Sequence, residues 1–232
     1  MRPEAYLLGG SGKPLASPTS SCTDPETLLS PNVTWVTGEH RYDRPVIPHA
    51  DGPVADSVRL AWPAEAASIA ELQRRAWSTQ LPADLAEVML GRLVVEEMAA
   101  AWLAAITRPP RASYRVLVAV DQERVVGFAT TVPSPDDDAE EGRDGEVEQF
   151  VVDPVAQHRG HGSRLLNACA DTLRADGFGR ASWWVAATDD DLRRFLTAAG
   201  WAADGASREI GLEDGSVRLK QVRLQTDLAV SD

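Results

Sequence analysis

A strand, a turn that contains two glycines and an amphipathic helix follow one another in the second half of the chain, and this unit limits the possible folds most strongly. The strand is predicted for residues 146–152, and the turn contains Gly160 and Gly162. The helix is predicted for residues 162–176, and a further strand follows over residues 180–187. A central β-α-β unit in this context predicts a mixed sheet of the α/β (or α+β) class, with helices on both faces.

The other periodic segments extend this sheet. Alternating apolar residues predict strands, and apolar residues at helical spacing predict helices. Pro109 and Pro110 end the second helix, because proline cannot continue one. The additional elements are a strand over residues 58–62, helices over 64–80 and from 83 to the proline pair, a hairpin of strands 114–120 and 124–132, a short helix over 189–199 and two closing strands within 201–228.

The composition changes near residue 57, and this change sets the predicted domain boundaries. Residues 1–56 are rich in Pro, Ser, Thr, Gly and Asp and show no sustained period, which predicts a poorly ordered extension. Residues 57–228 form the predicted folded domain, and residues 229–232 form a short tail.

Charge and cysteine content exclude several classes of partner. The formal net charge of −12 disfavours a nucleic acid or an anionic membrane, because both would be repelled. We expect neither a signal peptide nor a membrane span, since no apolar run is long enough. Cys22 and Cys169 have no disulfide-framework or metal-ligand spacing, so no metal is expected. A reduced, cytoplasmic setting is predicted.

The glycine turn is suited to binding a phosphate group. Backbone N–H groups in the first turn of a helix have no intrahelical acceptor and carry positive partial charge. Gly160 and Gly162 permit positive φ and a close approach of a ligand, while Arg159 and Arg164 add charge at the rim. A Rossmann turn is not predicted, because the third glycine of G-x-G-x-x-G is missing. These residues alone are compatible with several protein families that have a phosphate-binding turn.

The same residues resemble the acetyl-CoA pyrophosphate loop of the GNAT superfamily, whose pattern is Arg/Gln-x-x-Gly-x-Gly/Ala. The match here is Gln157-x-x-Gly160-x-Gly162 after Val-Asp-Pro. The segment 195–201 resembles the superfamily's later motif, which ends in Gly-Phe. The resemblance covers about residues 57–228, and it implies the acyl-CoA N-acyltransferase fold with acetyl-CoA as acyl donor.

The resemblance also implies which groups hold the acetyl-CoA. Backbone groups of Phe150, Val151 and Val152 would pair with the pantetheine arm and point at the thioester carbonyl. N–H groups of the turn would hold the pyrophosphate. The residues implied in the turn are Gln157, His158, Arg159, Gly160, His161, Gly162 and Ser163.

Transfer to an amine needs a base, because an alkyl ammonium has a pKa of about 10 and cannot attack while it is protonated. Glu146 and Glu148 lie two residues apart on one predicted strand face, and both are candidates. Some GNAT branches use a glutamate at the position that matches Glu146. The tyrosine with which many relatives assist the leaving sulfur is replaced by Leu196, and a frequent asparagine is replaced by Asp189, so the general acid is left open.

Three functions remain in competition at this point. The first is an N-acetyltransferase that acts on an amine-bearing small molecule, peptide or protein. The second is a regulatory module that binds an acyl-CoA without turnover, and Leu196 motivates it. The third is a phosphate-binding domain of another family. The sequence does not identify an acceptor.

Four expectations concern surface and core. His158 and His161 lie on the glycine turn without a carboxylate partner, so both are predicted to be exposed. The acidic loop 133–145 is predicted to be solvated and mobile. One indole of Trp183-Trp184 should be buried and the other half-exposed. A homodimer is possible through pairing of late strands such as residues 217–224.

Overall fold

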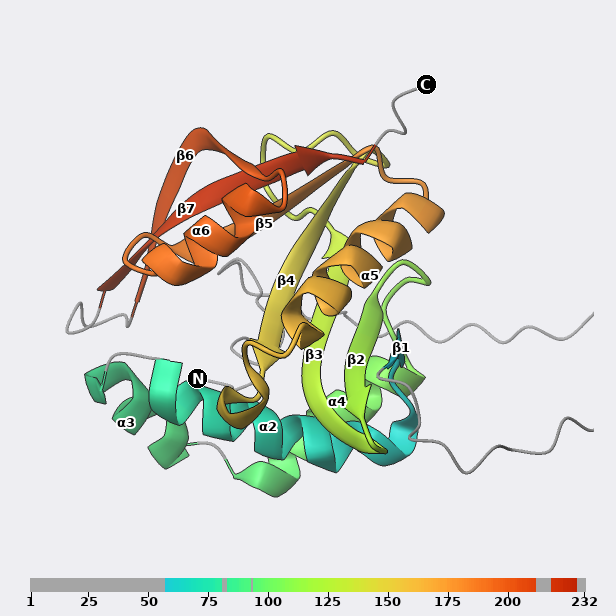
Figure 1. Cartoon of the computed structure of the whole chain (residues 1–232), viewed down its shortest axis with the longest axis vertical. Helices are drawn as coiled ribbons and strands as arrows, with labels where there is room; N and C mark the ends of the chain where they lie inside the picture. The colour runs from blue at the N-terminus through green and yellow to red at the C-terminus, as the bar shows by residue number, and fades with distance from the viewer. Residues whose placement is uncertain (1–56, 81–82, 93, 212–217, 229–232) are drawn as a thin grey trace, which may run out of the picture. The chain divides into compact units, whose positions relative to one another are not determined.

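The computed structural model describes residues 57–80, 83–92, 94–211 and 218–228 of the chain. These residues form a seven-stranded sheet with the strand order β1-β2-β3-β4-β5-β7-β6 (Figure 1). Neighbouring strands are antiparallel except for β4 and β5, which are parallel. The strands are β1 (Ser57–Leu60), β2 (Arg115–Asp121), β3 (Arg124–Pro133), β4 (Asp144–Val152), β5 (Arg180–Ala186), β6 (Ala202–Gly211) and β7 (Arg218–Asp227).

Helices cover both faces of the sheet, which confirms the predicted mixed α/β architecture. Helices α2 and α4 pack on one face, and α5 packs on the other (Figure 1). The helical elements are η1 (Pro63–Glu65), α2 (Ala66–Gln80), α3 (Ala83–Arg92), α4 (Val95–Thr107), η2 (Pro154–Ala156), α5 (His161–Ala175) and α6 (Asp190–Ala198).

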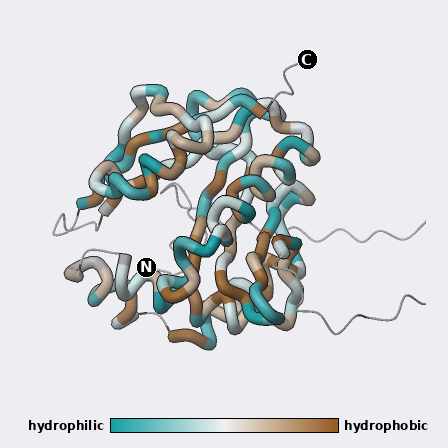
Figure 2. The backbone as a smooth tube through the Cα atoms, in the orientation of Figure 1, coloured by the Kyte–Doolittle hydropathy of each residue, from teal (hydrophilic) through white to brown (hydrophobic). Residues whose placement is uncertain are grey.

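The alternation of side chains along the strands builds one apolar core on each face. In β2, Val116, Val118 and Val120 join the cluster under α2 and α4, whereas Leu117 and Ala119 join the cluster under α5. Hydrophobic residues accordingly follow the central strands in Figure 2. A strand that is buried on both faces reads as a continuous apolar run, and β2 does so.

The predicted second helix is wrong in one respect, because two helices occupy its place. Helix α3 ends at Arg92, and α4 begins at Val95. Between them, Val94 is extended, with φ −88° and ψ 134°. The break coincides with Gly91 and with two adjacent β-branched residues, all of which have weak helical propensity.

Some predictions lie outside the described residues. These are the extension 1–56, the tail 229–232 and Cys22, and the domain boundaries stay predictions. Cys169 is buried and free in the core, as expected of a small apolar residue. The prediction that β7 pairs across a dimer is wrong, because β7 already pairs with β5 on one edge and with β6 on the other.

Candidate active site

Strands β4 and β5 separate soon after they meet, and the separation creates the candidate site. They pair over residues 144–146 and 180–182, with Glu146 opposite Ser182 as the last pair in the described strands. Beyond it, β4 continues beside β3 while β5 turns away with β7 (Figure 1). The edge of β4 that faces the gap therefore presents backbone groups without a strand partner. An extended ligand with amide groups can pair with such an edge.

The predicted phosphate turn connects the end of β4 to α5. Asp153 accepts a hydrogen bond from the N–H of Val155 at 3.2 Å, which starts the short helix η2. His158 and Gly160 then adopt positive φ angles of 61° and 84°. The first bond of α5 runs from the N–H of Arg164 to the carbonyl of Gly160, so the preceding N–H groups of the first turn lack an intrahelical acceptor.

Gly162 places this helix start at the gap. A Cβ built on Gly162 would lie 3.8 Å from Cγ2 of Val152, at the end of β4, and 3.9 Å from Cζ of Phe195 in α6. These are ordinary contact distances, so a small side chain fits there and a large one does not. The turn, the end of β4 and α6 therefore meet at one place.

His161 corrects one prediction about the turn. His158 is exposed as expected, but the side chain of His161 is only 2% exposed. Its Nε2 lies 3.8 Å from Oδ2 of Asp121, at the β2–β3 turn, and has no hydrogen-bond partner among the described residues. Nη1 of Arg159 lies 3.5 Å from the same oxygen. The side chain of His161, which was predicted to be exposed, is therefore buried next to a turn that is distant in sequence.

Glu146 lies at the point where β4 and β5 separate. The residue is 3% exposed, and its Oε2 has no hydrogen-bond partner among the residues that the structure describes. Burial and, to a smaller extent, the negative charge of Asp136 raise the pKa of Glu146 to about 8, although Arg208 opposes the shift. Glu146 is therefore largely protonated at neutral pH.

Glu148 is the extra residue of a β-bulge. Thr131 pairs with Val147 and Thr130 pairs with Gln149, so Glu148 has no partner in β3. Burial raises its pKa to about 7, although a hydrogen bond from Thr130 at 3.4 Å opposes the shift. The charge of Glu148 also contributes to the raised pKa of Glu146, which shows that the two carboxyl groups interact. A carboxylate that titrates near neutral pH is well placed to act as a base.

A buried chain of hydrogen bonds fixes the bulge to the helical layer. Nε1 of Trp102 in α4 donates to Gln73 in α2 at 2.9 Å, and Nε2 of Gln73 donates to Oε1 of Gln149 at 2.8 Å. The N–H of Gln149 donates to Oγ1 of Thr130 at 3.0 Å. Gln73 is completely buried, so its bond with Trp102 is formed away from water. The sequence analysis did not predict this chain of hydrogen bonds.

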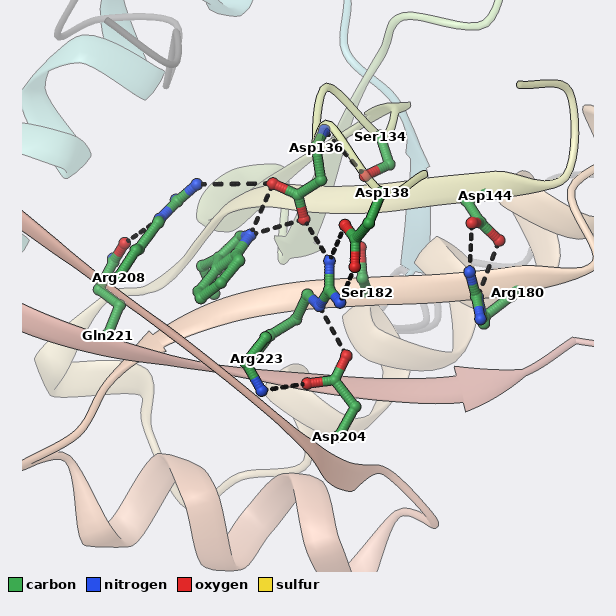
Figure 3. A network of polar contacts seen from close by, with 12 residues as sticks. Ser134, Asp136, Asp138, Asp144, Arg180, Ser182, Asp204, Arg208, Gln221 and Arg223 are labelled. Atoms are coloured by element: carbon green, nitrogen blue, oxygen red, sulfur yellow. Dashed lines mark hydrogen bonds and ion pairs between the residues drawn. The ribbon is translucent and has the colours of Figure 1, made fainter. Parts of the chain in front are cut away.

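A second polar network covers the start of β5 (Figure 3). Nε1 of Trp184 donates to both carboxylate oxygens of Asp136, at 3.0 and 3.2 Å. Arg223 in β7 donates to Asp136, Asp138 and Asp204 at distances between 2.6 and 2.9 Å. Trp183, in contrast, is buried in the core at 5% exposure, so one indole is buried and one half-exposed as predicted.

The network corrects the prediction for the acidic loop. Asp136 has only 12% of its side chain exposed, and it ties the loop to β5 and β7 through Trp184 and Arg223. Asp136 is therefore anchored to the sheet and largely shielded from solvent, whereas Asp138 binds Arg223 but stays 65% exposed as expected of a solvated loop. No local signal predicts the anchor, because Arg223 lies more than eighty residues further along the chain.

Leu196 is completely buried in the core. This is the position at which many relatives carry the tyrosine that assists the leaving sulfur, and an alkyl side chain cannot donate a proton. Asp189, which replaces the frequent asparagine, caps α6 by accepting a hydrogen bond from the N–H of Leu192 at 3.0 Å. Both departures from the family pattern therefore have a structural role here.

The described ranges contain neither a candidate metal-binding cluster nor a candidate membrane-spanning helix. Within residues 57–80, 83–92, 94–211 and 218–228, no three His, Cys, Asp or Glu side chains are grouped so as to hold a metal ion. The helices of the same ranges include none that is long and apolar enough to cross a membrane.

A mixed sheet whose parallel strands separate beside a glycine turn defines a protein of the acyl-CoA N-acyltransferase fold. Three solved structures share it at low identity. The first is the putative acetyltransferase yncA from Salmonella typhimurium with acetyl-CoA, at 21% identity and a TM-score of 0.58 over 76% of this chain and 95% of that chain. The second is an N-acetyltransferase from Staphylococcus aureus Mu50, at 16% identity and a TM-score of 0.60 over 76% of this chain and 100% of that chain. The third is a ribosomal-protein-alanine N-acetyltransferase from Brucella melitensis, at 20% identity and a TM-score of 0.59 over 74% of this chain and 99% of that chain.

The family is shown by the sequence itself. A model of the acetyltransferase (GNAT) family matches residues 68–201, which is more than half of the chain. No curated protein gave a significant match. The chain belongs to the acetyltransferase (GNAT) family, and the chemistry of this family is acetyl transfer.

Proposed function

We propose that this protein is an acetyl-CoA-dependent N-acetyltransferase that transfers acetyl directly to a primary amine. The observation that carries the proposal is the meeting of the free edge of β4 with the start of α5 at Gly162. Backbone groups of Phe150, Val151 and Val152 supply hydrogen bonds to the pantetheine arm. The turn of Gln157, His158, Arg159, Gly160, His161, Gly162 and Ser163 supplies N–H donors to the pyrophosphate.

The glutamates supply the proton chemistry. The acceptor arrives as an ammonium ion and gives one proton to Glu148, or to Glu146 when that carboxyl is ionised. The amine nitrogen then forms a bond to the thioester carbon, and a backbone N–H of β4 stabilises the resulting oxyanion. The C–S bond breaks and the sulfur leaves as thiolate, while the nitrogen gives its second proton to water and becomes the neutral amide. The thiolate takes up the proton held by the carboxyl group, so one proton of the ammonium ends on the thiol and the other in solvent.

The second candidate function is an acyl-CoA-binding module without turnover. Leu196 favours this alternative, because it removes the usual proton donor to the sulfur. A thiolate is a good leaving group even without a proton donor, since a free thiol has a pKa of only about 8.5. We therefore place the catalytic function first. A cytoplasmic location remains an expectation from the sequence.

Calorimetry of acetyl-CoA binding tests the cofactor site. Gly162→Trp should abolish saturable binding, because the indole would fill the space between Val152 and Phe195. Gly162→Ala is the matched control and should bind like the wild type, since its methyl group makes only ordinary contacts. Gly160 is a poorer target, because its φ of 84° would strain any side chain.

Release of free thiol with a panel of amines then separates the two candidate functions. Turnover with any amine establishes the enzyme. Tight binding without turnover of any amine supports the binding module. A folded wild type that binds neither acetyl-CoA nor a longer acyl-CoA would contradict both.

A further inference from the structure

The sheet register places two arginines, Arg208 and Arg223, on the same face as Glu146. Glu146 lies opposite Ser182 in β5, and Trp184 is two residues further along, so all three point to the same side. Trp184 pairs with Arg223 in β7, Gln221 is two residues before Arg223, and Gln221 pairs with Arg208 in β6. The side of the sheet that carries the candidate base therefore also carries the guanidinium of Arg208.

Arg208 is held in place, and its one ion pair in the described residues, to Asp136, is a long one. Its Nε donates to Gln221 at 2.8 Å, and its guanidinium lies 4.3 Å from the centre of the Trp184 ring. Nη1 is 3.9 Å from Asp136, which is too long for a hydrogen bond. Among the described residues, neither Nη atom has an acceptor at hydrogen-bond distance. Arg223 differs, because it already binds three carboxylates.

The surroundings of Arg208 disfavour an uncompensated charge. About two thirds of its side chain is buried, since its exposure is 31%. Burial lowers the pKa of Arg208 from its ordinary value, against the pull of Glu146 and Asp136. A guanidinium that is stacked on an indole, and whose Nη atoms have no hydrogen-bond acceptor among the described residues, is preorganised for a planar anion such as a carboxylate.

Glu146 provides the independent second observation. Its carboxyl group is buried, and its Oε2 has no partner among the described residues. A buried polar atom without a partner is costly unless a ligand satisfies it. The anion-binding and the amine-binding groups thus lie on one side of the sheet, and Trp184 lies between them in the register.

We infer that Arg208 binds a carboxylate of the acceptor, so that the acceptor is a molecule carrying both an amine and a carboxylate, an amino acid in chemical class. This inference rests on the proposed N-acetyltransferase function. Arg208 fixes the carboxylate by paired N–H bonds, Trp184 supports the chain between the two groups, and Glu146 and Glu148 receive the amine.

Acceptors that differ in a single group test the inference. Thiol release is measured at saturating acetyl-CoA with amino acids, with their carboxamides and with the corresponding decarboxylated amines. The wild type should prefer the acids by at least about tenfold in kcat/KM, since a hydrogen-bonded charge pair is worth roughly that much or more. Arg208→Gln should lower kcat/KM for the acids about 10- to 100-fold, mainly through KM, and should change the amides less than about threefold.

The controls separate specificity from folding. Arg218→Gln removes an exposed arginine that pairs with Glu209 at 3.2 Å, and it should leave the preference unchanged. Calorimetry with acetyl-CoA should give the same affinity for Arg208→Gln and for the wild type, and thermal unfolding of the variant should remain cooperative.

Several results would overturn the inference while acetyl-CoA binding remains intact. They are equal turnover of acids and amides by the wild type, a preference for decarboxylated amines or diamines, a preference for acids that survives in Arg208→Gln, and no turnover of any acid. Loss of acetyl-CoA binding by the wild type would instead refute the proposed function, so the two failures are distinguishable.

Discussion

Glu146 and Glu148 show how one strand can carry two carboxyl groups with different pKa values. Both lose water on folding, but Glu146 also faces Asp136, whereas Glu148 receives a hydrogen bond from Thr130. The charge of Asp136 disfavours the ionisation of Glu146, whereas the hydrogen bond from Thr130 favours the ionisation of Glu148. The pKa of Glu146 is therefore raised further than that of Glu148, and Glu148 is the better base at neutral pH.

Glu148→Gln should lower kcat about 100- to 1000-fold, which is the usual contribution of a general base. The wild-type kcat/KM for the ammonium form of the acceptor should rise with pH up to about 7 and then level off, because the base must be ionised and its pKa is about 7. In the variant this rising limb of the pH profile should disappear, while acetyl-CoA binding stays unchanged. The exposed Glu209→Gln serves as control. A limb that persists near pH 7 would exclude Glu148, and a limb near pH 8 would indicate Glu146.

Glu146 should destabilise the fold at alkaline pH. Its pKa is about 8 in the native protein against an ordinary value of 4.5, so the native state keeps a proton that the unfolded state releases. The free energy of unfolding should therefore decrease as pH rises from about 4.5 to about 8. Glu146→Gln should raise the melting temperature at about pH 8 and lose this advantage near pH 4.5. The exposed Glu97→Gln should show no such pH-dependent gain, and a constant difference across the range would contradict the argument.

At the scale of elements, β4 is the strand on which the site depends. One edge pairs with β3, the other becomes free after Glu146, and the bulge at Glu148 interrupts the register between them. A strand with a free edge and a bulge needs support from side chains. The chain Trp102–Gln73–Gln149 gives that support from helices α4 and α2.

Gln73→Leu should lower the free energy of unfolding by about 2–4 kcal/mol, because it leaves the indole N–H of Trp102 and the amide oxygen of Gln149 without their partner. It should also lower kcat, since the bulge loses its fixed position. Denaturant unfolding and steady-state kinetics measure the two effects. Asn167→Leu, on the exposed side of α5, should stay within about 0.5 kcal/mol of the wild type. Equal stability of the two variants would show that the buried chain does not support β4.

At the scale of the whole described domain, Arg223 connects segments that are distant in sequence. It joins the loop before β4 through Asp136 and Asp138, and it joins β6 through Asp204. The same loop carboxylate binds Trp184 of β5. The side of the candidate acceptor site near Trp184 is therefore assembled from parts of the chain that are distant in sequence: the loop before β4, strand β5, and strands β6 and β7.

Arg223→Met should destabilise the protein by about 3 kcal/mol, because Asp136 and Asp204, with 12% and 11% of their side chains exposed, would be left without their cation. Hydrogen exchange should increase over residues 134–143, which lose their anchor to β7. The exposed Arg218→Met should produce neither change. Unaltered exchange in the loop would mean that Trp184 alone holds it.

The elements and the family pattern could be predicted because they are local. Alternation and helical spacing predicted the strands and most helices, and Gln157, Gly160 and Gly162 predicted the turn that lies at the gap. The break at Val94 was missed, because apolar residues keep helical spacing across it. The burial of His161 was missed for another reason, since Asp121 approaches it from a distant turn.

The sequence by itself determined the family, the mixed sheet with helices on both faces and the glycine turn before α5, because each follows from neighbouring residues. The tertiary structure alone decided the protonation of Glu146 and Glu148, the anchoring of the acidic loop and the position of Arg208 on the side of the sheet that carries Glu146. These properties depend on burial and on charges from strands far apart in the chain. Burial and cross-strand register arise only when the sheet is assembled.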